Sequence, residues 1–143
     1  MRTLAILPVK TFGAAKQRLV PALGPDSRAT LARAMFTDVL AALREVPALD
    51  ALAVVTADPA AEADARGAGA GVLPDKEQAG QSAAASIGIS YALAEDFARV
   101  LLVPGDTPLL DPREVEVLLQ GRGPVSIVPD RHGTGTNALV LTP

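Results

Sequence analysis

The sequence predicts an α/β protein with a mostly parallel central sheet and helices on both faces. Short apolar runs alternate with longer amphipathic segments along the 143 residues, and this alternation is typical of parallel strands joined by crossover helices. Hydrophobic residues make up 49% of the chain, which is enough for one sizeable core. We therefore expect a single domain over residues 1–143.

The apolar runs give the strands. Bounded by Gly, Pro, Asp or charged residues, they predict strands at residues 3–7, 51–56, 71–73, 100–103, 125–128 and 138–141. A loop at 9–16 follows the first strand, and a loop at 129–136 joins the last two. The chain has no internal repeat or low-complexity linker.

The segments between the strands predict helices. They begin near Gly24, after Asp58-Pro59, near Gly80 and at Asp111-Pro112, where Asp suits the N-cap and Pro the first turn. They end near Arg44, Gly67, Glu95 and Gly121. In the first helix, the apolar stripe facing the sheet is expected to consist of Leu31, Met35, Val39 and Leu43, widened by Phe36 and Leu40. In the third helix, the inward residues are expected to be Ala83, Ile87 and Tyr91.

Composition narrows the function classes. The net charge is −3 and aromatic residues are 3% of the chain, whereas nucleic-acid binding needs a basic face or aromatic platforms. We therefore expect no nucleic-acid partner. There is no cysteine, which excludes disulfides and thiolate chemistry. No apolar run approaches the length of about 18 residues that spans a bilayer, so we expect a cytoplasmic protein without membrane contact.

Polar residues follow several of the predicted strands, at the edge where α/β sheets bind ligands. Lys10, Lys16 and Arg18 come just after the first strand. Three cations there suit a triphosphate, although a solvated surface loop explains them equally well. The chain has neither a GxxxxGK[ST] nor a GxGxxG motif. Thr56 and Asp75 follow the second and third strands, and Asp75 is also a candidate turn residue.

Asp106 and a later glycine-rich loop are the other candidates. The run at 100–103 leads through Pro104-Gly105 to Asp106, where a carboxylate can hold a divalent cation on a nucleotide phosphate or simply form a turn before Pro108. The loop at 133–137 offers amides and hydroxyls that can surround a phosphate or carboxylate, or make a tight connection. His132, the single histidine, is predicted to be solvated.

These pieces, in this order, resemble one family. Several stretches are similar to motifs of the guanylyltransferases of deazaflavin coenzyme F-420 biosynthesis. They are Ile6-Leu7-Pro8-Val9-Lys10 with Ala15-Lys16-Gln17-Arg18-Leu19, then Val54-Val55-Thr56, Gly105-Asp106-Thr107-Pro108-Leu109 and the stretch from Pro129 to Leu139. The resemblance covers essentially the whole chain. It implies a nucleotide-diphospho-sugar transferase fold, which is glycosyltransferase-A-like. The implied activity joins GMP from GTP to phosphoenolpyruvate or 2-phospho-L-lactate and releases pyrophosphate.

The resemblance also implies roles for individual residues. Lys10, Lys16 and Arg18 would hold the GTP phosphates and serve catalysis, and Asp106 would bind Mg²⁺. The nucleotide would be bound by Pro8, Val9, Lys10, Thr56, Asp75, Gly80 and Ser82. The acceptor would meet Gly135, Thr136 and Asn137. A homodimer is compatible with this class. Family members continue beyond the equivalent of Pro143 with a second metal-binding Asp, so we expect the C-terminal part of the domain to be missing.

Two alternatives stay open on the sequence. One is another small-molecule nucleotidyltransferase, similar to molybdopterin guanylyltransferase. The other is a truncated paralogue that binds nucleotide without turning it over. A missing catalytic His or Cys does not argue against the transferase, because the attacking phosphate oxygen is largely ionised at pH 7, with a second pKa of about 6.

Overall fold

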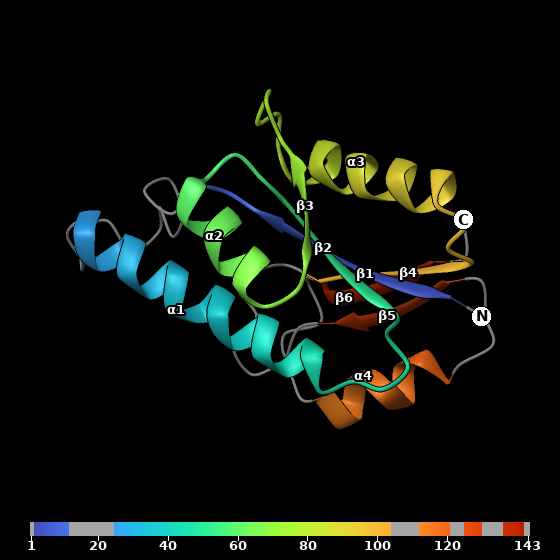
Figure 1. The fold of residues 1–143 in the computed structure, drawn as a ribbon. Coiled ribbons are helices and arrows are strands. Elements are labelled where there is room, and N and C mark those ends of the chain that lie inside the picture. The colour runs from blue at the N-terminus through green and yellow to red at the C-terminus, as the bar shows by residue number, and fades with distance from the viewer. Residues whose placement is uncertain (1, 12–24, 104–111, 121–124, 130–135, 142–143) are drawn as a thin grey trace.

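The computed structural model describes residues 2–11, 25–103, 112–120, 125–129 and 136–141. The described residues form six strands and four helices in the predicted order, and Figure 1 shows their arrangement. Their bounds are β1 Thr3–Val9, α1 Pro25–Arg44, β2 Ala51–Thr56, α2 Pro59–Gly67, β3 Gly71–Pro74, α3 Gln81–Ala94, β4 Arg99–Leu102, α4 Pro112–Leu119, β5 Val125–Pro129 and β6 Thr136–Leu141. The α/β prediction is confirmed, and most ends lie within one or two residues of those expected.

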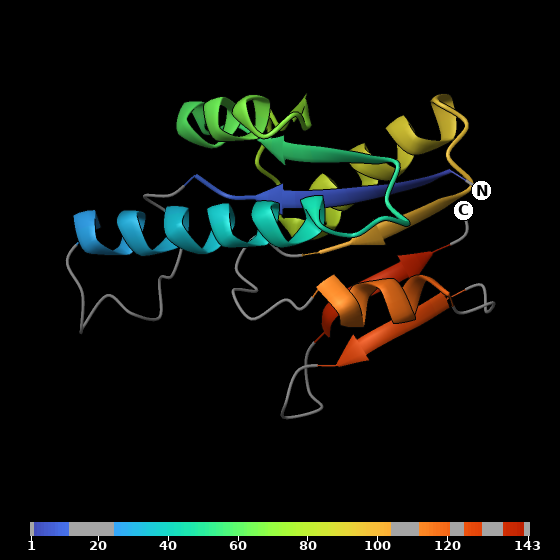
Figure 2. The ribbon, with the colours of Figure 1, turned by 60° about the horizontal axis from the view of Figure 1, so that its bottom comes forward.

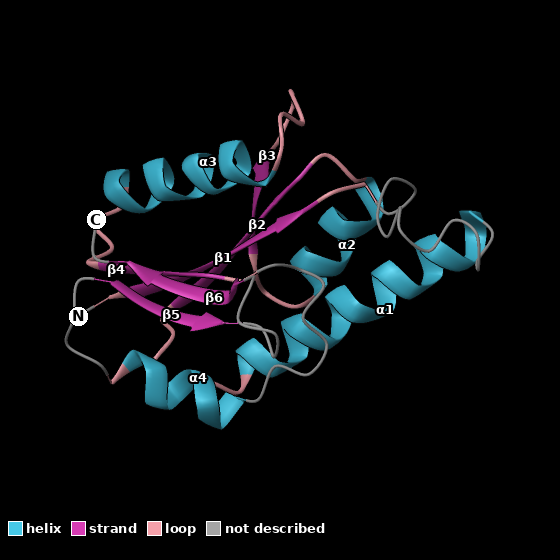
Figure 3. Ribbon diagram, turned by 180° about the vertical axis from the view of Figure 1, so that it is seen from behind, coloured by secondary structure: helices cyan, strands magenta, loops and turns pink. Residues whose placement is uncertain are grey.

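All six strands form one sheet in the order β3-β2-β1-β4-β6-β5. The pairs β3–β2, β2–β1 and β1–β4 are parallel, whereas β6 is antiparallel to both β4 and β5. Figure 3 shows β4, β6 and β5 side by side, with β6 between the other two strands. The connection between β5 and β6 is short, and a short connection joins antiparallel strands because a parallel crossover needs a dozen or more residues.

Residues along the central strands alternate between two cores. Ala5, Leu7 and Val9 of β1 belong to one cluster with α1, α2 and α4, whereas Leu4 and Ile6 belong to a second cluster with α3. This alternation follows from the two-residue period of a strand. The sheet therefore lies between α1, α2 and α4 on one face and α3 on the other, as Figures 1 and 2 show.

β1 runs two residues further than predicted, through Pro8 to Val9. Proline is disfavoured inside a sheet because it cannot donate a hydrogen bond to a neighbouring strand. The β1–β4 register ends at Ile6 opposite Leu102, and Val103 N then donates to Ile6 O at 3.0 Å. The backbone groups of Pro8 point toward β4, as those of Ile6 do, because residues two apart face the same neighbouring strand. The β1–β4 pairing has already ended at Ile6. No ladder bond is lost, so β1 continues to the edge where the candidate residues begin.

The predicted stripe of α1 is partly wrong. Phe36, Val39, Leu40 and Leu43 are buried as expected, but Leu31 is 37% exposed. Ala32 is buried in its place. Steps of four residues drift around the helix by about 40° each, since successive residues are about 100° apart. The stripe that stays on the sheet therefore mixes steps of three and four.

The predicted inward face of α3 is wrong at its aromatic residue, because Tyr91 is 37% exposed. Ala84 and Ala92 are buried, with Gly88 between them. A Cβ on Gly88 would lie 2.5 Å from Cγ2 of Ile6, so the helix approaches β1 more closely than any side chain allows. Large apolar residues usually mark a buried face; here the smallest residues mark it instead.

Polar side chains tie the amino ends of the strands together. Asp50 Oδ2 accepts a hydrogen bond from Thr3 N at 2.7 Å, and Asp50 N donates to Thr3 O at 2.9 Å. The Arg99 guanidinium donates to the Thr3 hydroxyl at 3.2 Å and to the carbonyl of Leu119 at the end of α4. Thr3 is fully buried, so these bonds satisfy groups that water does not reach.

Candidate functional site

Several of the candidate residues meet at the carboxyl ends of the parallel strands. The register places Val9 at the end of β1 opposite Thr56 at the end of β2, and Thr56 opposite Pro74 at the end of β3. Pro8 and Val9 therefore lie beside Thr56, with Asp75 one residue beyond β3. We call this end of the sheet the carboxyl edge. It comprises the ends of β1, β2 and β3 and the residues that follow them, including Lys10, Thr56 and the loop from Asp75 to Gly80.

The first loop of the carboxyl edge begins with Lys10, whose side chain is exposed directly after β1. Its cation thus extends from the central strand of the parallel part of the sheet. Lys16 and Arg18, the other two members of the predicted phosphate cradle, lie outside the described residues. The structure therefore places one cation of the three at this edge.

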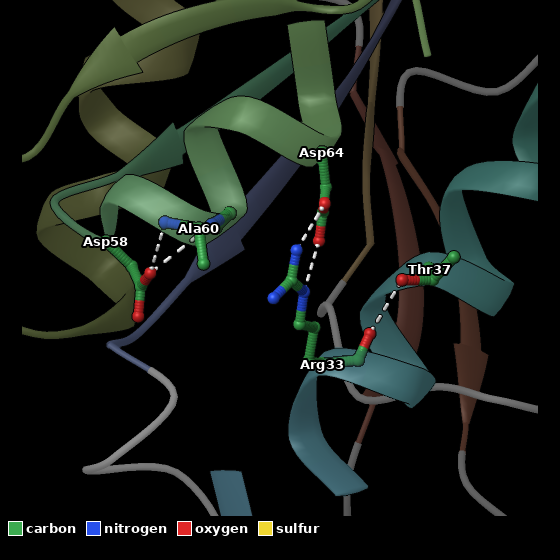
Figure 4. Close-up of polar contacts among 6 residues, drawn as sticks. Arg33, Thr37, Asp58, Ala60 and Asp64 are labelled. Carbon is green, nitrogen blue, oxygen red and sulfur yellow. Dashed lines mark hydrogen bonds and ion pairs between the residues drawn. The ribbon is translucent and has the colours of Figure 1, made fainter. Parts of the chain in front are cut away.

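Thr56 organises the middle of the edge. It is only 4% exposed, its Oγ1 accepts a hydrogen bond from Asp58 N at 3.0 Å, and its carbonyl accepts one from Asp75 N at 3.2 Å. Asp58 in turn caps α2, since its Oδ1 accepts hydrogen bonds from Ala60 N at 2.8 Å and Ala61 N at 3.3 Å (Figure 4). Thr56 thus holds the start of α2 and the end of β3 in place.

Asp75 begins the loop that leads into α3. It is 9% exposed, and its Oδ1 accepts a hydrogen bond from Gln78 N at 3.2 Å. Gln78 and Gly80 both have positive φ angles, +48° and +111°. Glycine accepts such an angle without strain, so Gly80 lets the chain turn sharply into the helix. Ser82 lies exposed on the first helical turn.

The start of α3 gives the edge a positive electrostatic end. The first turn of α3 contains no acidic residue, and Gly80 at its N-cap makes no side-chain hydrogen bond. By contrast, α2 carries the Asp58 cap and has Glu62 in its first turn. Unpaired N–H groups and the helix dipole favour negative charge at such an end. Of these two helix starts, the one at α3 is the better suited to an anion.

The other side of the edge is described only in its backbone. Leu102 near the end of β4 pairs with Leu139 of β6, so the earlier residues of the antiparallel β6 extend past the end of β4. Thr136 opposes Pro129, and Asn137 is the extra residue where the β5–β6 register shifts. Gly135 and Asp106 lie outside the described residues. Thr136 and Asn137 thus reach the same end of the sheet as Thr56.

No three His, Asp or Glu side chains come together to hold a metal ion within the ranges that the structure describes. The acids at this edge, Asp58 and Asp75, use a carboxylate oxygen to accept backbone N–H groups. The Mg²⁺ site predicted at Asp106 stays a prediction. In the same described ranges, no helix combines the length and hydropathy of a membrane span.

Sequence reasoning did not single out Asp58 or Gln78 as organisers of the edge. The signal for Asp58 was present, because Asp before Pro is a common helix start. The left-handed conformation of Gln78, whose N donates to Asp75 Oδ1, had no such signal in the sequence.

Comparison with known proteins places the chain in a family. Residues 3–143 match the family described as guanylyl transferase CofC like. The chain is 48% identical over 148 residues to a Conexibacter woesei protein named phosphoenolpyruvate guanylyltransferase, covering 100% of this chain and 66% of that one. It is 36% identical over 145 residues to a Methanothermobacter thermautotrophicus protein named 2-phospho-L-lactate guanylyltransferase, covering 100% and 63%. The chain thus spans about two thirds of the length of these relatives.

Solved structures support the fold. The chain superposes with a TM-score of 0.80 on a Desulfovibrio desulfuricans protein assigned as a nucleotide-diphospho-sugar transferase, at 20% identity, covering 99% of this chain and 64% of that one. The TM-score is 0.68 with a nucleotidyl transferase from Methanothermobacter, at 19% identity, covering 99% and 71%. The expected nucleotide-diphospho-sugar transferase fold is confirmed. The chain belongs to the CofC-like guanylyl transferase family.

Proposed function

We propose that this protein transfers GMP from GTP to phosphoenolpyruvate or 2-phospho-L-lactate, with release of pyrophosphate, in coenzyme F-420 biosynthesis. The observation that carries the proposal is the carboxyl edge, where Lys10, Thr56, Asp75 and the start of α3 meet around the ends of three parallel strands. Ligands of open α/β sheets bind at such an edge. The names of the relatives supply the donor group and the acceptors.

The chemistry requires positioning and charge neutralisation. An oxygen of the acceptor's phosphate attacks the α-phosphorus of GTP, a new P–O bond forms, and the bond to the β-phosphate breaks with pyrophosphate leaving. The attacking oxygen is largely ionised at neutral pH, so no general base is needed. Two polyanions must instead be brought together, and cations must neutralise the departing pyrophosphate.

The residues divide this work as follows. Lys10, Lys16 and Arg18 bind the phosphates, while Pro8, Val9, Thr56, Asp75, Gly80 and Ser82 surround the nucleoside. Gly135, Thr136 and Asn137 meet the acceptor. Asp106 holds Mg²⁺, which neutralises phosphate charge when bound. Its ligand type fits Mg²⁺, which is commonly held by one or two carboxylates plus phosphate oxygens. A homodimer and a cytoplasmic location remain part of the proposal.

Phosphoenolpyruvate is the acceptor that the relatives favour. The proteins that are 48% and 40% identical carry its name, whereas the protein named for 2-phospho-L-lactate is 36% identical. We therefore expect faster pyrophosphate release with phosphoenolpyruvate than with 2-phospho-L-lactate when each is supplied with GTP and Mg²⁺.

The decisive experiment compares Lys10→Ala with Arg44→Ala. Arg44 is an exposed cation in the last turn of α1, near the amino ends of the strands. Loss of a charge-assisted contact to a phosphate weakens an interaction by a factor of about 10 to 100. We expect Lys10→Ala to lower kcat/KM for GTP by that factor and Arg44→Ala to leave it unchanged. Equal activity of all three proteins would contradict the role of the edge.

A further inference from the structure

Asp75 is a buried acid whose acceptor capacity is only partly used. An ionised carboxylate can accept about four hydrogen bonds, and a buried one is stabilised only where donors replace water. Asp75 is 9% exposed, and within the part of the chain that the structure describes its side chain accepts one hydrogen bond, from Gln78 N to Oδ1. Oδ2 has no donor among those residues.

The carboxylate is also held in one orientation. The backbone N–H of Asp75 is bonded to Thr56 O, and Oδ1 is bonded to Gln78 N three residues later. These two bonds tie the residue to β2 on one side and to the left-handed turn at Gln78 on the other. A fixed acceptor at a ligand edge favours ligands that present donors to it, because an unfilled buried acceptor costs free energy.

The start of α3 brings the opposite polarity to the other end of the same loop. It follows Asp75 by six residues, and its first turn offers backbone N–H groups without a side-chain cap. A carboxylate at one end of a binding loop and N–H groups at its other end together match one edge of guanine. On that edge N1–H and the N2 amino group are donors for the carboxylate, and O6 is an acceptor for the N–H groups. Adenine presents an acceptor at N1 and a donor at N6, the reverse pattern.

We propose that Asp75 is the residue that selects guanine, accepting hydrogen bonds from N1–H and the N2 amino group of the bound nucleotide. This inference rests on the proposed function, since it assumes that a purine nucleotide lies at the carboxyl edge. It adds that guanine is selected over other purines, and that the Asp75 carboxylate oxygens make the selective contacts. Hypoxanthine, which lacks the N2 amino group, is bound more weakly than guanine for the same reason.

The test replaces one hydrogen-bond acceptor of Asp75 with a donor. Asp75→Asn keeps the shape and the oxygen that accepts from Gln78 N, but it turns the other oxygen into an NH₂ donor. That donor opposes the N2 amino group of guanine and suits the 2-oxo group of xanthine. Affinities for GTP, ITP, XTP and ATP, each with Mg²⁺, are measured by calorimetry on the purified protein and its variants. Glu77→Gln is the matched control, because it removes one exposed acid from the same loop.

The wild type is expected to bind GTP about tenfold or more tightly than ITP, and to bind XTP and ATP more weakly still. Asp75→Asn is expected to lose about tenfold or more in GTP affinity and to gain affinity for XTP, while Glu77→Gln keeps the wild-type order. A gain for XTP also shows that the variant is folded. An unchanged order of nucleotides in Asp75→Asn overturns the inference alone. Failure of the wild type to bind any of the four overturns both the inference and the proposed function.

Discussion

The two ends of the sheet differ in how they use polar groups. At the amino ends, side chains bond to one another and to the backbone: Arg2 donates to the carbonyl of Glu95 at 2.8 Å and stacks over Phe97 at 4.3 Å, and Glu116 accepts from Ala48 N at 3.1 Å. At the carboxyl edge, Lys10 is exposed and the start of α3 lacks a side-chain cap. The first arrangement stabilises the fold, and the second leaves groups for a ligand.

The comparison teaches how a small α/β domain divides its tasks. At the amino ends of the strands, polar groups are paired with one another. Substitutions there should change the stability of the fold without changing ligand binding. Positive φ angles occur at both ends, at Gln78 and Gly80 near the carboxyl edge and at Gly69 and Asp96 near the amino ends. The carboxyl edge differs by its buried acid, Asp75, which has one described donor, and a buried acceptor that lacks donors costs stability. Substitutions should therefore separate stability from nucleotide affinity according to the end they alter.

The largest effect is expected from Arg99→Met at the amino end. The change removes donors to the buried Thr3 hydroxyl and to Leu119 O, while Met keeps much of the aliphatic length. We expect the free energy of unfolding to fall by about 2–3 kcal/mol in urea titrations. GTP affinity should stay within about twofold. Arg44→Met, an exposed matched control, should change stability by less than about 0.5 kcal/mol. A loss of affinity without a loss of stability would break the division between the ends.

A change in α3 should affect both ends, because this helix runs between them. Gly88→Ala places a methyl group 2.5 Å from Cγ2 of Ile6, and such overpacking costs about 1–3 kcal/mol. The helix must move outward and take its first turn away from Asp75, so GTP affinity should fall as well.

The matched control for Gly88→Ala is Gly67→Ala, where a Cβ meets nothing within 4 Å. It should be neutral or slightly stabilising. Ile6→Ala removes the atoms that clash, so its combination with Gly88→Ala should be destabilised by less than the sum of the two changes. Strict additivity in this cycle would show that the contact does not set the position of α3.

The smallest effect is expected from the ion pair between α1 and α2, which lies at neither end. Arg33 Nε and its second guanidinium nitrogen each donate to Asp64 at 2.8 Å (Figure 4). The hydrogen bond from Arg33 lowers the pKa of Asp64, and burial partly opposes this shift. The same bond raises the pKa of Arg33, which therefore stays charged through the ordinary pH range.

Because the pKa of Asp64 is lower in the folded state, its stabilisation is present above the ordinary aspartate pKa of about 3.9 and is lost as pH falls through the lowered value. The difference in Tm between the wild type and Asp64→Ala should be small at pH 7 and should vanish in strong acid. High salt should also reduce it, since exposed pairs are screened. A difference that is unchanged in acid would contradict this account.

The sequence predicted the order of elements because each boundary carries its own chemistry. Asp58-Pro59 and Asp111-Pro112 mark helix starts, and apolar runs such as 51–56 are too short for a typical helix, which favours a buried strand. The meeting of Pro8, Val9, Thr56 and Asp75 also followed, since parallel strands end together. The faces of α1 and α3 did not follow at Leu31 and Tyr91, which are each 37% exposed. Periodicity gives the number of apolar faces but not the point where a helix contacts the sheet.

The sequence alone thus determined the α/β class, the strand and helix order, the family and the candidate residues, because local periodicity, capping and motifs are properties of short segments. Only the tertiary structure decided which groups are satisfied and which remain open. It buried Asp75 with a single described donor, made Gly88 the contact of α3 with Ile6, and joined Arg99 to Thr3 across 96 residues of chain. These outcomes depend on distances between segments far apart in the chain, which only packing in three dimensions sets.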